Sequence, residues 1–123
     1  IANRYDVLAK YAKSLKATYA EEIGKLGRFS PQDAQMLKKL RHWLQLDEDK
    51  LEEAHRAELR AGLAKSKALH TVYGMRGELA ALWQRSSASK DQLIKQLQDW
   101  CHRAEASGIT PLVEFSQRLR SYA

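Results

Sequence analysis

The sequence predicts an all-α fold, a compact bundle of about six helices joined by short loops. Apolar residues recur at three- and four-residue steps along most of the chain, the spacing of one helical face. Only six Gly and two Pro interrupt 123 residues, and Ala, Leu, Lys, Glu, Gln and Arg favour helix over sheet. We therefore expect residues 1–123 to form a single helical domain with one core. Because the chain opens on Ile1 directly in a helical pattern, we interpret it as a fragment of a longer protein or a trimmed chain.

The first predicted helix runs from about residue 3 to residue 26, where Gly24 and Gly27 are expected to cap it. Its predicted core face consists of Tyr5, Leu8, Tyr11, Ala12, Leu15, Tyr19, Ile23 and Leu26. Ser30 and Pro31 then predict a second helix, with Ser30 as the cap and Pro31 at the first helical position. The predicted buried stripe of that helix is Met36, Leu37, Leu40, Trp43 and Leu44.

Four more helices are predicted in the rest of the chain. The acidic residues 47–49 form either a loop or the first turn of a third helix over about 49–64, which Gly62 weakens by roughly 1 kcal/mol. A fourth helix starts at Ser66 and reaches residue 83, and its two glycines at 74 and 77 either admit another helix or cost stability. After a loop at 86–88, Ser89 and Gln92 predict a capping box. That helix ends at Gly108, and a last one runs from Thr110 to about residue 122.

The formal net charge of +6 is concentrated in the first third of the chain. Residues 1–45 hold nine Lys or Arg against four Asp or Glu, whereas residues 46–123 hold twelve against eleven. A basic surface favours an anionic partner such as lipid headgroups, nucleic acid or an acidic protein, although a solvated face is the simpler interpretation. No apolar run exceeds five residues, so no membrane span is predicted. The single cysteine excludes an internal disulfide and favours a reducing compartment.

No catalytic, cofactor-binding or metal-ligating residue is predicted. The four histidines, at positions 42, 55, 70 and 102, never have the spacing that places two ligands on one helical face. Cys101 and His102 are adjacent and point about 100° apart, so Cys101 is interpreted as a core residue. The carboxylates at 47–49 and 52–53 suggest either a cation site or a solvated helix start, and the second interpretation is favoured because no calcium-loop pattern follows.

The aromatic residues also have a structural explanation. Trp43, Trp83 and Trp100 each lie on a predicted apolar stripe, which favours core packing over ligand stacking. The last two helices superficially resemble a helix-turn-helix unit. However, Arg118 and Arg120 come late in the final helix, whereas recognition helices read bases from their N-terminal residues. Sequence-specific DNA recognition is therefore not predicted from this pattern.

Residues 3–12, Leu82-Trp83, 97–101 and 104–109 together resemble the C-terminal extension of bacterial membrane fatty-acid (acyl-CoA) desaturases. That resemblance implies a non-catalytic accessory domain at the cytoplasmic face of the membrane. The parent chain would introduce a double bond into acyl chains with di-iron and oxygen, and its membrane catalytic domain would be the partner. The sequence has neither the HxxxH nor the HxxHH pattern of the family, so none of its iron ligands maps here.

Under this interpretation, four lysines of the first helix are candidates for contact with the catalytic domain or with anionic lipid headgroups. They are Lys10, Lys13, Lys16 and Lys25.

A second resemblance covers the chain from Phe29 onward and ends in the phrase from Trp100 to Leu112. It is similar to the C-terminal helical part of DDE-type insertion-sequence transposases. In that family, further chain carrying the final acidic catalytic residue follows, and no residue of this sequence matches it. We take the desaturase domain as the main prediction and a DNA-binding transposase region as the alternative, with nucleic acid as the less favoured partner.

Overall fold

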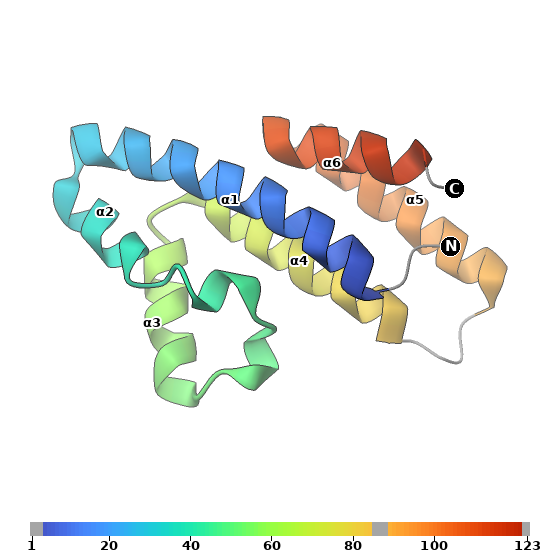
Figure 1. Cartoon of the computed structure of the whole chain (residues 1–123), viewed down its shortest axis with the longest axis horizontal. Coiled ribbons are helices and arrows are strands. Elements are labelled where there is room, and N and C mark those ends of the chain that lie inside the picture. The colour runs from blue at the N-terminus through green and yellow to red at the C-terminus, as the bar shows by residue number, and fades with distance from the viewer. Residues whose placement is uncertain (1–3, 85–88, 122–123) are drawn as a thin grey trace.

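The computed structural model describes residues 4–84 and 89–121, and its regular elements in these ranges are all helical (Figure 1). The α-helices are α1 (Arg4–Phe29), α2 (Pro31–Lys38), α3 (Glu53–Leu63), α4 (Lys67–Gln84), α5 (Lys90–Ala106) and α6 (Thr110–Ser121). Two short 3-10 helices, η1 (Trp43–Gln45) and η2 (Glu48–Lys50), lie between α2 and α3. The predicted all-α bundle of about six helices is confirmed.

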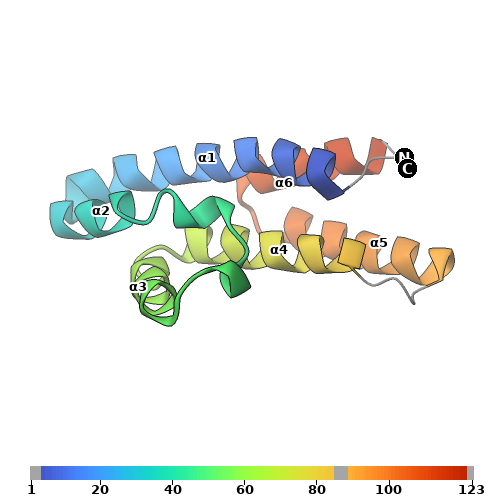
Figure 2. The same ribbon diagram turned by 60° about the horizontal axis from the view of Figure 1, so that its bottom comes forward.

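The long helices form two layers, which Figure 2 shows edge on. Helix α1 packs against α4 along most of its length, and the α5–α6 hairpin packs against that pair, with α6 beside α1 and α5 beside α4. Helices α2 and α3 fold over the other end of α1 and α4 (Figure 1). Segments from the two ends of the chain, α1 and α6, thus lie side by side.

Three aromatic side chains from three helices hold the centre of the core. The Tyr11 ring meets Phe115 edge-on with centroids 4.9 Å apart and Trp100 with centroids 6.0 Å apart. The Tyr11 hydroxyl donates to the Val72 carbonyl oxygen at 2.5 Å, and the indole N–H of Trp100 donates to the Met75 carbonyl oxygen at 2.9 Å. Both polar groups therefore satisfy their hydrogen bonds on α4 while their rings stay buried.

The predicted end of the first helix is wrong. Helix α1 continues through Gly24 and Gly27 to Phe29, because both glycines keep helical backbone angles and neither acts as a cap. The predicted core face of this helix is mostly correct, except that Tyr5 is 78% exposed and Val7 is buried instead. The predicted start at residue 3 lies outside the described residues.

The second helix is shorter than predicted. Helix α2 ends at Lys38, and two turns and η1 carry the chain through the rest of the predicted stripe. Leu37, Leu40 and Leu44 are buried as expected, but Met36 is 39% exposed. Pro31 occupies the first turn as predicted, whereas the Ser30 side chain makes no capping hydrogen bond, so the predicted Ser30 cap is wrong.

The acidic residues 47–49 do not open the third helix, since Asp47 precedes η2, Glu48 and Asp49 lie in η2, and α3 begins only at Glu53. Gly62 has a packing reason that the sequence did not reveal. A Cβ atom at this position would overlap the Leu40 side chain, so only glycine lets α3 approach the buried Leu40 this closely.

The remaining helix boundaries agree with the sequence. The Leu69 amide donates to the Ser66 hydroxyl oxygen at the start of α4. At the start of α5, the Gln92 amide donates to Ser89 Oγ at 3.2 Å and the Ser89 amide donates to the Gln92 side-chain oxygen at 3.3 Å, the predicted capping box. Gly108 follows α5 with φ +73°, the left-handed conformation that favours glycine. The predicted loop at 86–88 and the helix end at residue 122 lie outside the described residues.

Candidate functional site

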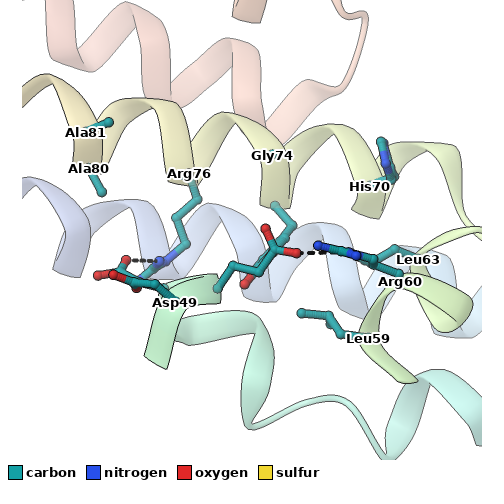
Figure 3. Close-up of a pocket in the computed structure, with 13 residues that line it drawn as sticks. Asp49, Leu59, Arg60, Leu63, His70, Gly74, Arg76, Ala80 and Ala81 are labelled. Carbon is teal, nitrogen blue, oxygen red and sulfur yellow. Dashed lines mark hydrogen bonds and ion pairs between the residues drawn. The ribbon is translucent and has the colours of Figure 1, made fainter. Parts of the chain in front are cut away.

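A cavity of about 450 Å³ separates α4 from the segment containing η2 and α3 (Figure 3). The Arg76 guanidinium reaches from α4 to Asp47 Oδ1 at 2.8 Å and to the Gln45 carbonyl oxygen at 2.7 Å. On the opposite wall, Arg60 Nε donates to Glu48 Oε1 at 3.2 Å. These arginines neutralise the carboxylates of Asp47 and Glu48. Their contacts across the cavity attach residues 45–48 to the helices around it.

The carboxylates at 47–49 and 52–53 therefore do not gather as a cation site. Within residues 4–84 and 89–121, no group of three or more His, Cys, Asp or Glu side chains is placed to hold a metal ion. Gly74 and Gly77 also line this cavity, and a Cβ at either would meet nothing within 4 Å. The hypothesis that they admit a neighbouring helix is therefore wrong for the described part of the chain.

The histidines and the cysteine have separate structural surroundings. The His55 ring stacks on Trp43 with centroids 4.5 Å apart, and His42, His70 and His102 are exposed. Cys101 is buried in the core, and this burial raises the pKa of its thiol. A raised pKa keeps the thiol protonated at neutral pH, so the interpretation of Cys101 as a core residue is supported.

Trp100 is fully buried, as the sequence predicted. Trp43 is only partly buried and packs at the margin of the core, and the Trp83 side chain is not among the described side chains.

The four candidate lysines are all exposed on α1 but do not form one cluster. Lys25 lies near the end of the helix, where its Nζ is 3.5 Å from Glu22 Oε2. Lys16 borders a cleft of about 410 Å³ between α1 and the η1–η2 segment, together with Lys50. Lys10 and Lys13 line a different depression on the other edge of the helix.

This depression, called here the α1/α6 groove, has a volume of about 500 Å³ and is lined from α1 by Lys10, Lys13 and Ser14 and from α6 by Arg118. Two carboxylates, Glu21 and Glu114, also border it. The structure thus adds Arg118, from the far end of the chain, to the predicted lysines. The sequence contained a signal for it, because Arg118 lies on the polar side of an amphipathic helix, but only the packing of α6 beside α1 shows what it faces.

Lys13 and Arg118 of the groove are available to a ligand. Among residues 4–84 and 89–121, neither Lys13 nor Arg118 forms a side-chain ion pair, in contrast to Arg120, which donates to Glu105 at 2.7 Å. Arg120 and the Ser116 hydroxyl also hold the pKa of Glu105 below its ordinary value. The arginine that sequence reasoning grouped with Arg118 is therefore occupied within the fold.

Comparison with known proteins shows that the chain is similar to transposases. The family whose description is "Transposase", the DDE ISL3 family, matches residues 1–123, and the chain belongs to this family. A particular relative is the transposase for insertion sequence element IS1001 of Bordetella parapertussis, which is 31% identical over 122 residues. The match covers 96% of this chain and 29% of that relative. No solved structure matches the chain.

The main functional prediction from the sequence, an accessory domain of a fatty-acid desaturase, is wrong, and the family membership supports the alternative prediction of a transposase. The predicted role in lipid metabolism is wrong for the same reason. Its finer parts, a di-iron parent, a membrane catalytic partner and a place at the cytoplasmic face of a membrane, have no support among known relatives. In the described ranges, no helix has both the length and the apolar character to cross a bilayer.

Proposed function

We propose that this chain is a helical, DNA-contacting part of an insertion-sequence transposase. The family match over residues 1–123 is the observation that carries the proposal. Because the chain spans about 29% of the relative from Bordetella parapertussis, we assign the strand chemistry to acidic residues elsewhere in the parent protein.

The exposed lysines of α1 are the proposed DNA contacts. Lys10, Lys13 and Lys16 follow one another at three-residue steps and span about 9 Å of helix axis. Each carries a point charge on a long, flexible stem, so Lys10 and Lys13 on one edge of α1 and Lys16 on the other can reach different phosphates of one duplex. Lys25 is a weaker candidate because Glu22 lies beside it.

Such contacts position DNA without reading its sequence. Base recognition needs side chains that enter a groove, usually from the start of a helix, whereas lysines on the flank of a long helix meet the phosphate backbone. We therefore expect binding that depends strongly on salt and weakly on base sequence.

A mobility-shift titration of the 123-residue chain against a random-sequence duplex tests this function. If about three phosphates are neutralised, log K should fall with log salt concentration with a slope of about −3. An absence of binding at low salt, or an affinity that does not change with salt, contradicts the proposal. A scrambled duplex of equal length serves as the control and should bind with similar affinity.

A further inference from the structure

We propose that the α1/α6 groove is a site for one phosphodiester of the DNA backbone, an inference that rests on the proposed function. Lys10, Lys13 and Arg118 supply the positive charge and the Ser14 hydroxyl supplies a neutral hydrogen bond. Since α1 and α6 come from opposite ends of the chain and meet only in the folded bundle, the site is a product of the fold (Figures 1 and 2).

The Ser14 hydroxyl gives an independent indication of a ligand. Ser14 lines the groove, is only 3% exposed, and its Oγ has no hydrogen-bond partner among the described residues. Thr18, one turn later, instead donates to the Ser14 carbonyl oxygen at 2.9 Å. Buried hydroxyls are almost always hydrogen-bonded, and an orphan therefore calls for a missing partner such as a ligand.

The hydroxyl is covered while the groove is empty, so a ligand must gain access to it. Serine has a single side-chain torsion with three staggered positions, and a change between them redirects the hydroxyl without moving the helix. A phosphate oxygen that enters the groove can then accept the hydrogen bond. Ser14 Oγ forms no hydrogen bond with either carboxylate that borders the groove.

The charge balance of the groove favours an anionic ligand such as a phosphodiester. Three cationic side chains face two carboxylates, Glu21 and Glu114, so the lining carries one net positive charge. A backbone diester carries one negative charge, which the net positive charge of the lining attracts. One diester would neutralise the net charge of the lining.

The apolar lining suits the sugar beside that phosphate. Four apolar residues line the groove, of which Val7, Pro111 and Phe115 are buried and Leu119 is half-buried. A deoxyribose ring that follows the phosphate can pack on the exposed part of Leu119 and remove it from water. A free inorganic phosphate has no such group, which makes a nucleic-acid backbone the better occupant.

The test uses two substitutions in the whole 123-residue chain, Ser14→Ala and Arg118→Gln, with Lys95→Gln on α5 as the control. Removing a hydrogen bond to a charged phosphate should raise the Kd of Ser14→Ala for duplex DNA about tenfold. The Tm of the free variant should be unchanged or higher, because an unsatisfied hydroxyl is lost and alanine favours helix. Arg118→Gln should make the salt slope about one unit less steep, and Lys95→Gln should leave it unchanged.

The possible outcomes distinguish a failure of the groove proposal from a failure of the proposed function. If the unmodified chain does not bind DNA, the proposed function fails and the groove proposal fails with it. If the unmodified chain binds with a steep salt dependence and both variants bind equally well, the groove proposal alone is overturned. A Ser14→Ala variant whose Tm and affinity fall together shows a structural hydroxyl and also overturns it. Equal losses on anionic vesicles and on DNA overturn the assignment to a DNA backbone. If Ser14→Ala fails to fold, the salt slope of the Arg118→Gln variant, whose substitution is at an exposed position, still tests the groove proposal.

Discussion

The Arg76 guanidinium, on α4, bridges the Asp47 carboxylate at 2.8 Å and the main-chain oxygen of Gln45 at 2.7 Å. Its side chain is only 9% exposed and that of Asp47 only 17%. Beside it, the Tyr73 hydroxyl donates to the Leu46 carbonyl oxygen at 3.0 Å. Tyr73 and Arg76, which are three residues apart on α4, therefore hold the segment around Leu46 and Asp47 between the short helices η1 and η2.

Arg76→Gln is expected to lower the free energy of unfolding by about 3 kcal/mol, because it leaves a largely buried carboxylate without this guanidinium. Urea unfolding followed by far-UV circular dichroism measures the loss. The matched control is Arg60→Gln, which breaks a more exposed pair with Glu48 and should cost less than about 1 kcal/mol. Equal losses of unfolding free energy in the two variants would show that Arg76 does not hold this segment in place.

Two serines before helices provide a second prediction. Ser89→Ala should destabilise the protein by about 1 kcal/mol, because the Ser89 side chain accepts a hydrogen bond from the Gln92 amide. Ser30→Ala should be close to neutral, because the Ser30 side chain makes no such bond at the start of α2. Thermal unfolding of both variants checks the contrast, and a larger effect at Ser30 would contradict it.

The glycines of α3 and α4 should respond in opposite directions to the same substitution. Gly74→Ala places a methyl group in open space on a helix and should stabilise by about 1 kcal/mol. Gly62→Ala forces the buried Leu40 side chain out of its place, a cost of about 1–3 kcal/mol that offsets the gain in helix propensity. Urea midpoints that rise equally for both would show that Leu40 yields at little cost.

The Tyr11 phenol predicts a loss of stability in alkali. Burial raises the pKa of Tyr11 far above its usual value of 10.0, so the folded protein keeps this group neutral. Its stabilising effect is complete below about pH 10 and declines at higher pH, because the unfolded chain ionises there and the folded chain does not.

Tyr11→Phe, which removes the hydrogen bond to Val72, should cost about 1 kcal/mol at pH 8. The gap between the unfolding free energies of the two proteins should then shrink as the pH rises past 10. The raised pKa of Tyr73 acts in both proteins and cancels in the comparison. A gap that is the same at pH 8 and pH 11 would contradict the account.

Local signals in the sequence predicted much of the fold. The capping box at Ser89, the glycine stop at Gly108 and the Ser66 start all depend on neighbours within a few residues, and all three were correct. The errors lie where distant contacts decide. Gly27 was predicted to cap α1, yet the helix continues past it to Phe29. Gly62 was predicted to weaken α3, but the Leu40 side chain packs against it.

The candidate site was only partly predictable for the same reason. Lys10 and Lys13 were identified from charge alone, but Arg118 joins them through the packing of α6 against α1, more than 90 residues away in the chain. The orphan hydroxyl of Ser14 is a property of packing and has no signature in sequence. The wrong family assignment rested on helix-forming phrases, which carry no chemical specificity, because many amphipathic bundles repeat them.

The central claim is that lysines of α1 contact DNA in this transposase-family chain, and a charge-matched comparison of salt slopes tests it most directly. One variant replaces Lys10, Lys13 and Lys16 by Gln, and the control replaces the exposed Lys67, Lys90 and Lys95, so both lose three positive charges. Mobility-shift titrations at several salt concentrations should give the α1 variant a slope less steep than the unmodified chain by about 1–2 units, and the control a nearly unchanged slope. Equal changes in the two variants, or no change in the α1 variant, would contradict the claim.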